Sequence, residues 1–191
     1  DGLQKLLLTE LVNELHLDGG DEEVAFEESI GGIASDYNGQ THVFFNNRYK
    51  DRPGASEKAE QWQILTPLRQ GQAGVLALNR AIQQRFRKRF IEMAHAEGYG
   101  RVIPSPAGPE EIIYGDKVIN IQNKRNRYIY PPKDDKYVAN GDIGVVVGHR
   151  KTKFRPKFPR DVEVELCSQP GFSYQYNSRE FDGQEIGRAH V

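Results

Sequence analysis

Hydrophobic residues recur at steps of three and four in two stretches of the chain, and this spacing is typical of one face of a helix. In the first stretch the recurring residues are Leu3, Leu7, Leu11 and Leu15. In the second stretch they are Val75, Leu78, Ile82, Phe86, Phe90 and Met93. The pattern predicts a helix over residues 1–17, ended by the glycines at 19 and 20, and a longer helix from residue 75 to about residue 96.

A hairpin is indicated farther along the first half. Asn38-Gly39 is a pair preferred in the two-residue type I′ turn, because both positions of that turn need a positive φ. Strand-favouring residues flank the pair on both sides, among them Tyr37 and Val43. We therefore expect two antiparallel strands within residues 33–45.

Residues 61–86 predict a strand, a tight turn and a helix in immediate succession. An apolar run at residues 62–65 predicts the strand, which Pro67 ends because proline has no N–H for a sheet. Gly71 and Gly74 then bracket the turn before the long helix. A strand that leads through a turn into a helix N-terminus is a geometry that binds anions, since free N–H groups point at the ligand. Arg69 lies in that turn, so it is a candidate ligand for a phosphate.

The second half of the chain changes to short strands separated by glycine and proline. Prolines at 104, 106 and 109 indicate a linker between two domains, residues 1–103 and residues 104–191. The predicted strands after it cover residues 112–114, 117–123, 128–130, 143–148, 162–166 and 172–176. Such strands indicate a small barrel or a sandwich, and an SH3-like barrel fits their number and length.

Basic residues gather in two blocks, although the net charge is only −1. Residues 61–91 hold 6 basic side chains and no acidic one, and residues 116–160 hold 12 basic side chains against 4 acidic ones. Two basic blocks in a nearly neutral chain suit a surface that meets a polyanion, and the plainer alternative is a solvated face. No apolar run approaches the roughly 18 residues of a membrane span, so we expect no membrane partner.

Metal and thiol chemistry find no support in the sequence. The 5 histidines stand apart without ligand spacing, and one cysteine cannot build a zinc site. Cys167 also excludes an internal disulfide, fits a reducing cytoplasmic location and lies in a strand-like run typical of a core thiol. Asp21-Glu22-Glu23 follows a glycine break, so we expect a solvated loop there and no magnesium-binding acidic pair.

One motif resembles a known family. Thr66-Pro67-Leu68-Arg69-Gln70-Gly71, followed by Gly74, Asn79 and Gln83, is similar to the fourth helicase motif of the RecD-like superfamily 1 DNA helicases. In that family the motif ends a strand of the second RecA-like motor domain. The resemblance implies that Arg69 approaches the γ-phosphate of ATP and that Thr66 lies near the nucleic-acid strand crossing the motor. A bidentate guanidinium suits the first role.

A second pair of motifs resembles the SH3-like barrel inserted into the same motor domain. The two read Gly115-Asp116-Lys117-Val118-Ile119 and Asn140-Gly141-Asp142-Ile143-Gly144-Val145-Val146. The resemblance covers roughly residues 60–166. It implies an α/β plus all-β fold, in which a partial RecA-like α/β segment over residues 1–103 is followed by a small SH3-like β-barrel over residues 104–191.

The predicted barrel carries cations beside aromatic residues. The candidate contacts to single-stranded DNA are Lys124, Arg125, Arg127, Arg150, Lys151 and Lys153. Bases stack on aromatic rings while phosphates pair with lysine and arginine, so this mixture suits a single strand. Tyr128 and Tyr130 follow the first cluster, and tyrosines of a small barrel are either core residues or a stacking platform. The sequence leaves both alternatives open.

A phosphate-binding loop is missing from the sequence. The chain contains no Gly-Lys pair, hence no G-x-x-x-x-G-K-[ST] motif to hold the β- and γ-phosphates. It also lacks the Thr-x-x-x-x-Gln-Gly motif that the family places after the barrel. We therefore expect a fragment of a helicase that hydrolyses no ATP alone, whose ATP and Mg²⁺ are held with the remaining motor domain of the parent chain. The alternative is a stand-alone SH3-like module that binds nucleic acid or protein.

Overall fold

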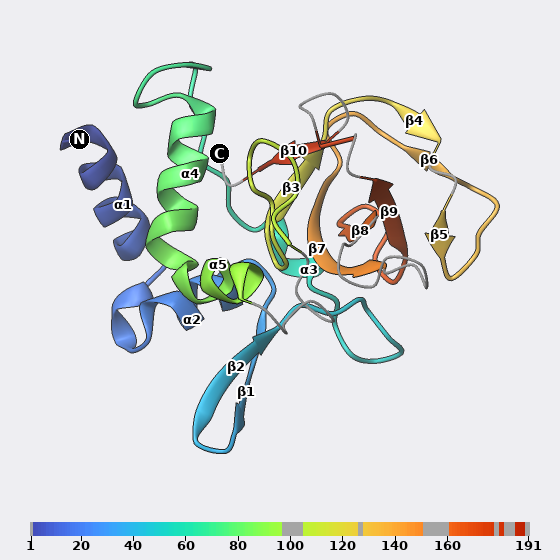
Figure 1. Cartoon of the computed structure of the whole chain (residues 1–191), viewed down its shortest axis with the longest axis horizontal. Coiled ribbons are helices and arrows are strands. Elements are labelled where there is room, and N and C mark those ends of the chain that lie inside the picture. Colours follow the sequence, from blue (N-terminus) through green and yellow to red (C-terminus); the bar gives the residue numbers. More distant parts are fainter. Residues whose placement is uncertain are drawn as a thin grey trace.

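The computed structural model of the 191-residue chain describes residues 2–96, 105–125, 128–150, 161–177, 180–181 and 186–189, with the backbone alone at 149 and 150. Helices and one hairpin make up the described part of the first half (Figure 1). The elements are α1 (Gly2–Glu14), η1 (Leu17–Gly19), α2 (Glu22–Ser29), β1 (Ile33–Tyr37), β2 (Gln40–Phe44), α3 (Ser56–Ala59), α4 (Val75–Phe86) and α5 (Lys88–His95).

An antiparallel sheet dominates the second half. Its strands are β3 (Lys117–Asn120), β5 (Ile129–Tyr130), β7 (Ile143–Arg150), β8 (Asp161–Leu166), β9 (Ser173–Asn177) and β10 (Ile186–Arg188). They lie in the order β10-β3-β7-β8-β9-β5, while β4 (Lys124–Arg125) and β6 (Tyr137–Val138) form a separate pair. The fold is thus a mixture of helices and a largely antiparallel sheet, and the predicted strands from residue 117 onward are confirmed in position within a few residues. The strand predicted at residues 112–114 is wrong, because Ile112 makes only an isolated bridge with Ala107.

The hairpin prediction is confirmed. β1 and β2 pair antiparallel, with Tyr37 opposite Gln40 across a two-residue turn. Asn38 and Gly39 have φ values of 51° and 74°, as a type I′ turn requires. The hairpin extends away from the rest of the molecule in Figure 1.

The single long helix predicted from residue 75 to about residue 96 is wrong. The chain leaves the helical conformation at Arg87, where φ is −134° and ψ is 28°, so α4 and α5 are separate helices that run in different directions (Figure 1). Arg87 is fully buried, and its guanidinium donates to the carbonyl oxygen of Tyr114 at 2.5 Å. A tertiary contact therefore accompanies the break, although the apolar spacing continues across it.

The strand predicted at residues 62–65 is also wrong. This segment is extended without joining a ladder, and Leu65 is 84% exposed. Trp62 packs edge-on against Phe26 of α2, with ring centroids 5.9 Å apart. The apolar side chains of Trp62 and Ile64 thus pack in the helical part of the core and need no sheet partner. Among residues 2–96 the only strands are those of the hairpin.

The expected solvated loop at residues 21–23 is a helix start. Asp21 is the N-cap of α2, and its carboxylate accepts hydrogen bonds from the backbone N–H groups of Glu23 and Val24 at 3.1 and 3.2 Å. Glu22 and Glu23 lie in the first turn, where negative charge is favourable beside the positive end of the helix dipole.

One apolar cluster joins the two halves of the sequence. It combines residues of the helices, such as Phe26 and Phe86, with Ile113 and Val145 from the second half. A second cluster lies within the sheet around Val164 and Tyr174. The predicted boundary near residue 103 falls among residues 97–104, outside the described residues, and stays a prediction.

Candidate functional site

The loop between Thr66 and Gly74 is closed by the threonine side chain. The hydroxyl of Thr66 donates to the carbonyl oxygen of Ala73 at 2.8 Å and accepts from the N–H of Leu68 at 3.2 Å. The N–H of Val75, the first residue of α4, donates to the carbonyl oxygen of Leu68 at 3.1 Å. Thr66 therefore orders the loop from inside, and its predicted role near a nucleic-acid strand stays a prediction.

Arg69 lies in this loop with its side chain exposed. The loop leads directly into α4, whose N-cap residue Gly74 makes no side-chain cap hydrogen bond and whose first turn carries no acidic residue. The positive end of the α4 dipole and the guanidinium of Arg69 thus belong to one short segment. This combination suits a negatively charged ligand such as a phosphate.

Three exposed tyrosines lie at the end of the molecule that holds β5 and β6, and we call this region the tyrosine face. Tyr128, Tyr130 and Tyr137 are 61%, 69% and 47% exposed. They lie on or beside β5 and β6, which Figure 1 shows at one end of the molecule with β4. Arg125 of β4, also exposed, is the register partner of Tyr137 of β6. Exposure excludes the core alternative for Tyr128 and Tyr130, and their role as a stacking platform stays a prediction.

The contacts of Lys124 within the protein keep its ammonium from binding a phosphate of DNA. Its ammonium forms an ion pair with the carboxylate of Glu180 at 2.5 Å and lies 4.0 Å from the ring centroid of Tyr176. Both side chains of the ion pair are largely buried. Among the predicted nucleic-acid contacts whose side chains are described, Arg125 is thus the one that the structure brings to the tyrosine face.

The remaining predicted contacts cannot be placed. Arg127, Lys151 and Lys153 lie outside the described residues. The backbone of Arg150 ends β7, opposite Asp161 of β8, and its side chain is not described. Their assignment to nucleic acid stays a prediction.

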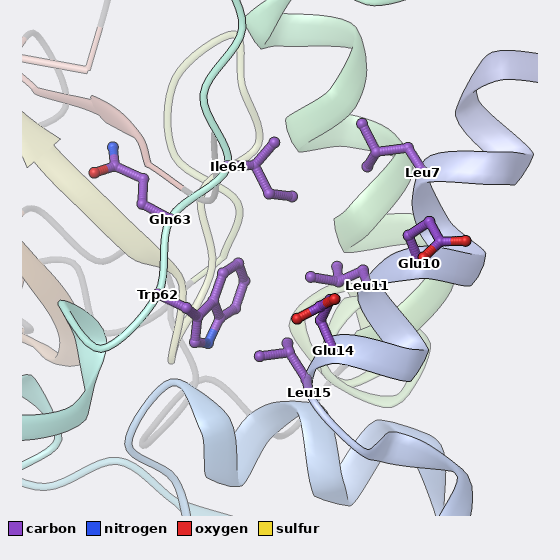
Figure 2. Close-up of a pocket in the computed structure, with 8 residues that line it drawn as sticks. All are labelled: Leu7, Glu10, Leu11, Glu14, Leu15, Trp62, Gln63 and Ile64. Carbon is purple, nitrogen blue, oxygen red and sulfur yellow. The ribbon is translucent and has the colours of Figure 1, made fainter.

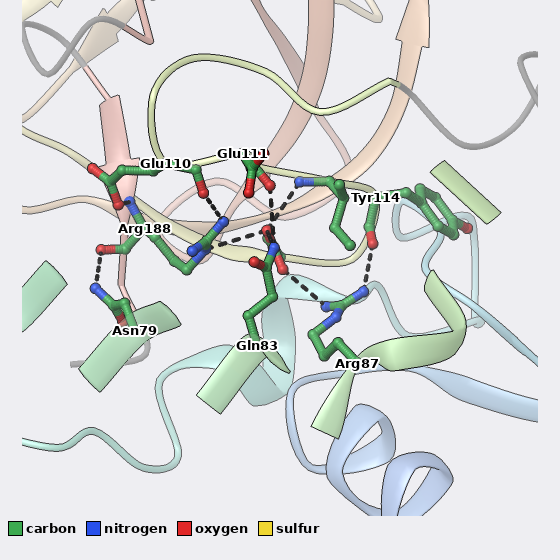
Figure 3. Close-up of polar contacts among 9 residues, drawn as sticks. Asn79, Gln83, Arg87, Glu110, Glu111, Tyr114 and Arg188 are labelled. Carbon is green, nitrogen blue, oxygen red and sulfur yellow. Dashed lines mark hydrogen bonds and ion pairs between the residues drawn. The ribbon is translucent and has the colours of Figure 1, made fainter. Parts of the chain in front are cut away.

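A buried ionic cluster lies where α4 meets the sheet, and sequence reasoning did not find it (Figure 3). Asp116 is fully buried between two arginines, Arg87 and Arg188, with N–O distances of 3.4 Å to each. Gln83 donates to the same carboxylate at 3.0 Å. The carboxylate thus receives charge and hydrogen bonds from two segments that are about 100 residues apart in the sequence, the end of α4 and β10.

Further hydrogen bonds close the cluster. Arg188 donates through its guanidinium and its backbone N–H to Glu110, and its carbonyl oxygen accepts from Asn79 at 3.1 Å. Burial raises the pKa of Glu110 above its ordinary value, against the lowering effect of Arg188. Asp116 is fully buried and Arg188 nearly so. The cluster therefore has a structural role and does not offer a ligand site. The sequence indicates this cluster only through Gln83 and Arg87. These two polar residues are four positions apart and lie beside the apolar face of the predicted helix.

Neither of the two reactive side chains near Trp62 is set up for chemistry. The ammonium of Lys117 donates to the carbonyl oxygen of Trp62 at 2.6 Å and lies 5.0 Å from its ring centroid. Burial lowers the pKa of Lys117 to about 8. Burial raises the pKa of Cys167 to about 12, so its thiol stays protonated and is no nucleophile at neutral pH.

Metal binding has no structural support within the described ranges, where no group of three or more His, Cys, Asp or Glu side chains could hold an ion. No helix among the described residues is long and apolar enough to cross a membrane.

Comparisons with protein-family models, with curated proteins and with solved structures find no match to this chain. The two candidate sites of the chain are therefore the loop at residues 66–74, which we call the arginine loop, and the tyrosine face.

Proposed function

We propose that this chain is part of a RecD-like superfamily 1 DNA helicase, namely a segment of the second RecA-like motor domain with an SH3-like insertion that contacts single-stranded DNA. In this proposal residues 1–103 form one wall of the ATP cleft. Residues 104–191 form the insertion that guides the strand. The alternative is a stand-alone nucleic-acid-binding or protein-binding module without motor activity.

The observation that carries the DNA part of this proposal is the exposure of the tyrosine face. A buried tyrosine ring would serve the core, whereas Tyr128 and Tyr130 each leave more than half of their surface in solvent. Stacking of one base on an exposed ring contributes about 1–3 kcal/mol and requires no particular base. Arg125, opposite Tyr137, supplies a cation for the phosphate backbone. Exposed rings and a cation in one region of the molecule support a single strand as the ligand.

The ATP part of the proposal rests on the arginine loop. Arg69 is exposed in a loop that Thr66 keeps closed, so its position relative to α4 is defined. A guanidinium can make two parallel hydrogen bonds to a phosphate, which an ammonium cannot. Because the sequence has no phosphate-binding loop, the remaining motor domain would hold most of the ATP and its Mg²⁺. ATP supplies the free energy for movement along the strand, and Arg69 would contact its γ-phosphate.

A comparison of two tyrosines tests DNA binding. Tyr130 and Tyr37 are equally exposed, at 69%, but Tyr37 lies at the turn of the β1–β2 hairpin, away from the tyrosine face. We expect Tyr130→Ala to weaken binding of a fluorescein-labelled oligothymidine by about fivefold or more, since it removes one stacked base contact. Fluorescence anisotropy at several salt concentrations measures the affinity.

Two controls complete this experiment. Tyr130→Phe retains the ring and should bind nearly as the unchanged chain does, and Tyr37→Ala should leave the affinity unchanged. Arg125→Ala should lower the affinity and flatten its salt dependence, because one phosphate contact on a single strand contributes roughly −0.7 to the logarithmic salt slope. Equal effects of Tyr130→Ala and Tyr37→Ala would contradict a role of the tyrosine face in binding.

A further inference from the structure

A groove runs between α1 and the extended segment at residues 62–64, far from the tyrosine face (Figures 1 and 2). Its volume is about 310 Å³. Leu7, Leu11 and Leu15 form one wall, and Trp62 and Ile64 form the other. The three leucines are spaced by four residues, so the groove follows α1 for roughly 12 Å, or about two turns of a helix.

The apolar character continues outside the groove. On α1, Leu3 and Leu6 are 54% and 58% exposed, and Leu65 follows Ile64 on the opposite segment. The rest of the chain therefore covers only part of the apolar surface of α1. Surfaces of this kind mark interaction sites.

Acidic residues border this apolar surface. Glu10 and Glu14 of α1 are exposed, one turn apart, and both line the groove (Figure 2). Among the described residues that line it, no side chain is a cation. The groove therefore combines an apolar floor with a negative edge.

We propose that this groove docks a basic amphipathic helix of a partner protein. Apolar side chains of the incoming helix, at steps of three and four, would fill the space between Leu11 and Trp62. Lysine or arginine residues beside them would meet Glu10 and Glu14. The length of the groove matches about two turns of such a helix. This inference does not rest on the proposed helicase function.

Charge argues against the other occupants. Nucleic acid carries phosphates that the negative edge repels. A second copy of this chain that docked its own α1 would bring a second Glu10 and Glu14 to the same edge. A cationic helix avoids both conflicts, and it fits a hydrophobic groove with an acidic rim better than an uncharged apolar peptide does.

The position of the groove connects its occupant with the arginine loop. The side-chain amide of Gln4 on α1 donates to the carbonyl oxygen of Gln72 in that loop at 2.8 Å. A helix that packs on α1 therefore lies beside the element that holds Arg69.

The single tryptophan of the chain provides a direct signal, because Trp62 lines the groove. The probe is a 14-residue peptide of the sequence LKKLLKLLKKLLKL, which is basic, amphipathic and free of tryptophan. We expect a saturable shift of the Trp62 emission to shorter wavelength as the peptide excludes water from the ring. The same peptide with glutamate in place of each lysine is the matched probe, and it should cause no shift.

Reversing the charge of Glu10 and Glu14 distinguishes docking in the groove from non-specific binding of the peptide. The double variant Glu10→Lys/Glu14→Lys should weaken binding of the basic peptide by about tenfold, because two attractive pairs become repulsive. The control variant Glu28→Lys/Glu92→Lys changes two exposed glutamates on α2 and α5, with the same change in net charge. It should bind the peptide as the unchanged chain does.

Three results would overturn the proposal. One is a Trp62 emission that does not respond to the basic peptide. Another is equal binding of the two peptides, or equal affinities of the two double variants, since either would show that the acidic edge does not select the ligand. A third is an emission shift that follows protein concentration without any peptide, since this would make a second copy the occupant.

Discussion

At the scale of single residues, Glu27 makes the free energy of unfolding depend on pH. It lies on α2 and is only 2% exposed, and burial raises its pKa to about 8. Arg87 and Arg89 oppose this shift, while Glu23 and Asp21 add to it. The folded state therefore keeps this carboxyl protonated at neutral pH, whereas the unfolded chain ionises it near its ordinary value of 4.5. The stability that the protonated group contributes is full below about pH 4.5 and is lost as the pH rises toward 8.

We expect Glu27→Gln to reduce the fall in unfolding free energy between pH 5 and pH 8. The amide keeps the shape of the protonated acid and cannot ionise, so the part of the pH-dependent loss that comes from Glu27, on the order of a few kcal/mol, should disappear. Burial also raises the pKa of Glu110, and its share of the loss should remain in the variant. Urea denaturation at four pH values measures it. Lys117 does not interfere, because its lowered pKa, about 8, changes stability only between that pH and its ordinary 10.5. Glu28→Gln, an exposed change on the same helix, should follow the unchanged chain; identical pH profiles for both variants would remove Glu27 as the cause.

At the scale of elements, one carboxylate joins the sheet to the segment that follows the hairpin. Glu165 of β8 is fully buried and accepts hydrogen bonds from three backbone N–H groups. The donors are Arg48 at 2.6 Å, Ser56 at 3.1 Å and Gly171 at 2.7 Å. These N–H groups have no partner in a strand ladder, and the carboxylate accepts their hydrogen bonds instead. These bonds anchor residues 48–56 to the sheet.

Replacing Glu165 by glutamine should destabilise the chain by about 2–4 kcal/mol, because the amide loses the charge and one of the two acceptor oxygens. Hydrogen exchange should show the loss of protection first at the amides of Arg48 and Ser56. The matched change is Glu57→Gln in the same segment, which removes an exposed ion pair with Arg48 at 3.6 Å. Such a pair contributes at most about 1 kcal/mol. A Glu165→Gln variant as stable as Glu57→Gln would contradict the role of the buried carboxylate.

At the scale of the whole molecule, the arginine loop and the tyrosine face belong to different parts of one body. The loop precedes α4 in the helical part, and the face lies with β4–β6 (Figure 1). The ionic cluster of Arg87, Asp116 and Arg188 connects the two parts. In a helicase this separation would let one region respond to ATP and the other hold DNA.

In the complete motor that we propose, Arg69→Ala should lower DNA-stimulated ATP hydrolysis by about 10³–10⁵-fold, the range for arginines that stabilise a transferring phosphoryl group. Arg69→Lys should recover little, because an ammonium lacks the two-pronged contact. Single-stranded DNA affinity without nucleotide should stay unchanged. Arg80→Ala, an exposed arginine of α4, is the control. Near-normal hydrolysis by Arg69→Ala would exclude Arg69 from the ATP site.

Local patterns account for the parts of the fold that the sequence predicted. The hairpin depends on Asn38 and Gly39, whose conformational preference acts within four residues. The α4 helix and most strands of the sheet follow from the spacing of apolar positions, which is also a local property. Arg69 was found for the same reason, since its motif is continuous in sequence. Tyr128 and Tyr130 were found as well, but their exposure and the third tyrosine, Tyr137, were not.

The sequence by itself therefore determined the hairpin, the start of α4, the succession of antiparallel strands and the position of the arginine loop. Only the tertiary structure decided that the helix breaks at Arg87, that residues 61–65 join no sheet and that Lys124 is paired with Glu180. Each of these outcomes depends on a partner that lies more than 20 residues away, as Asp116 does from Arg87. Periodicity in one segment carries no information about such a partner, because burial and charge pairing arise only when distant segments pack together.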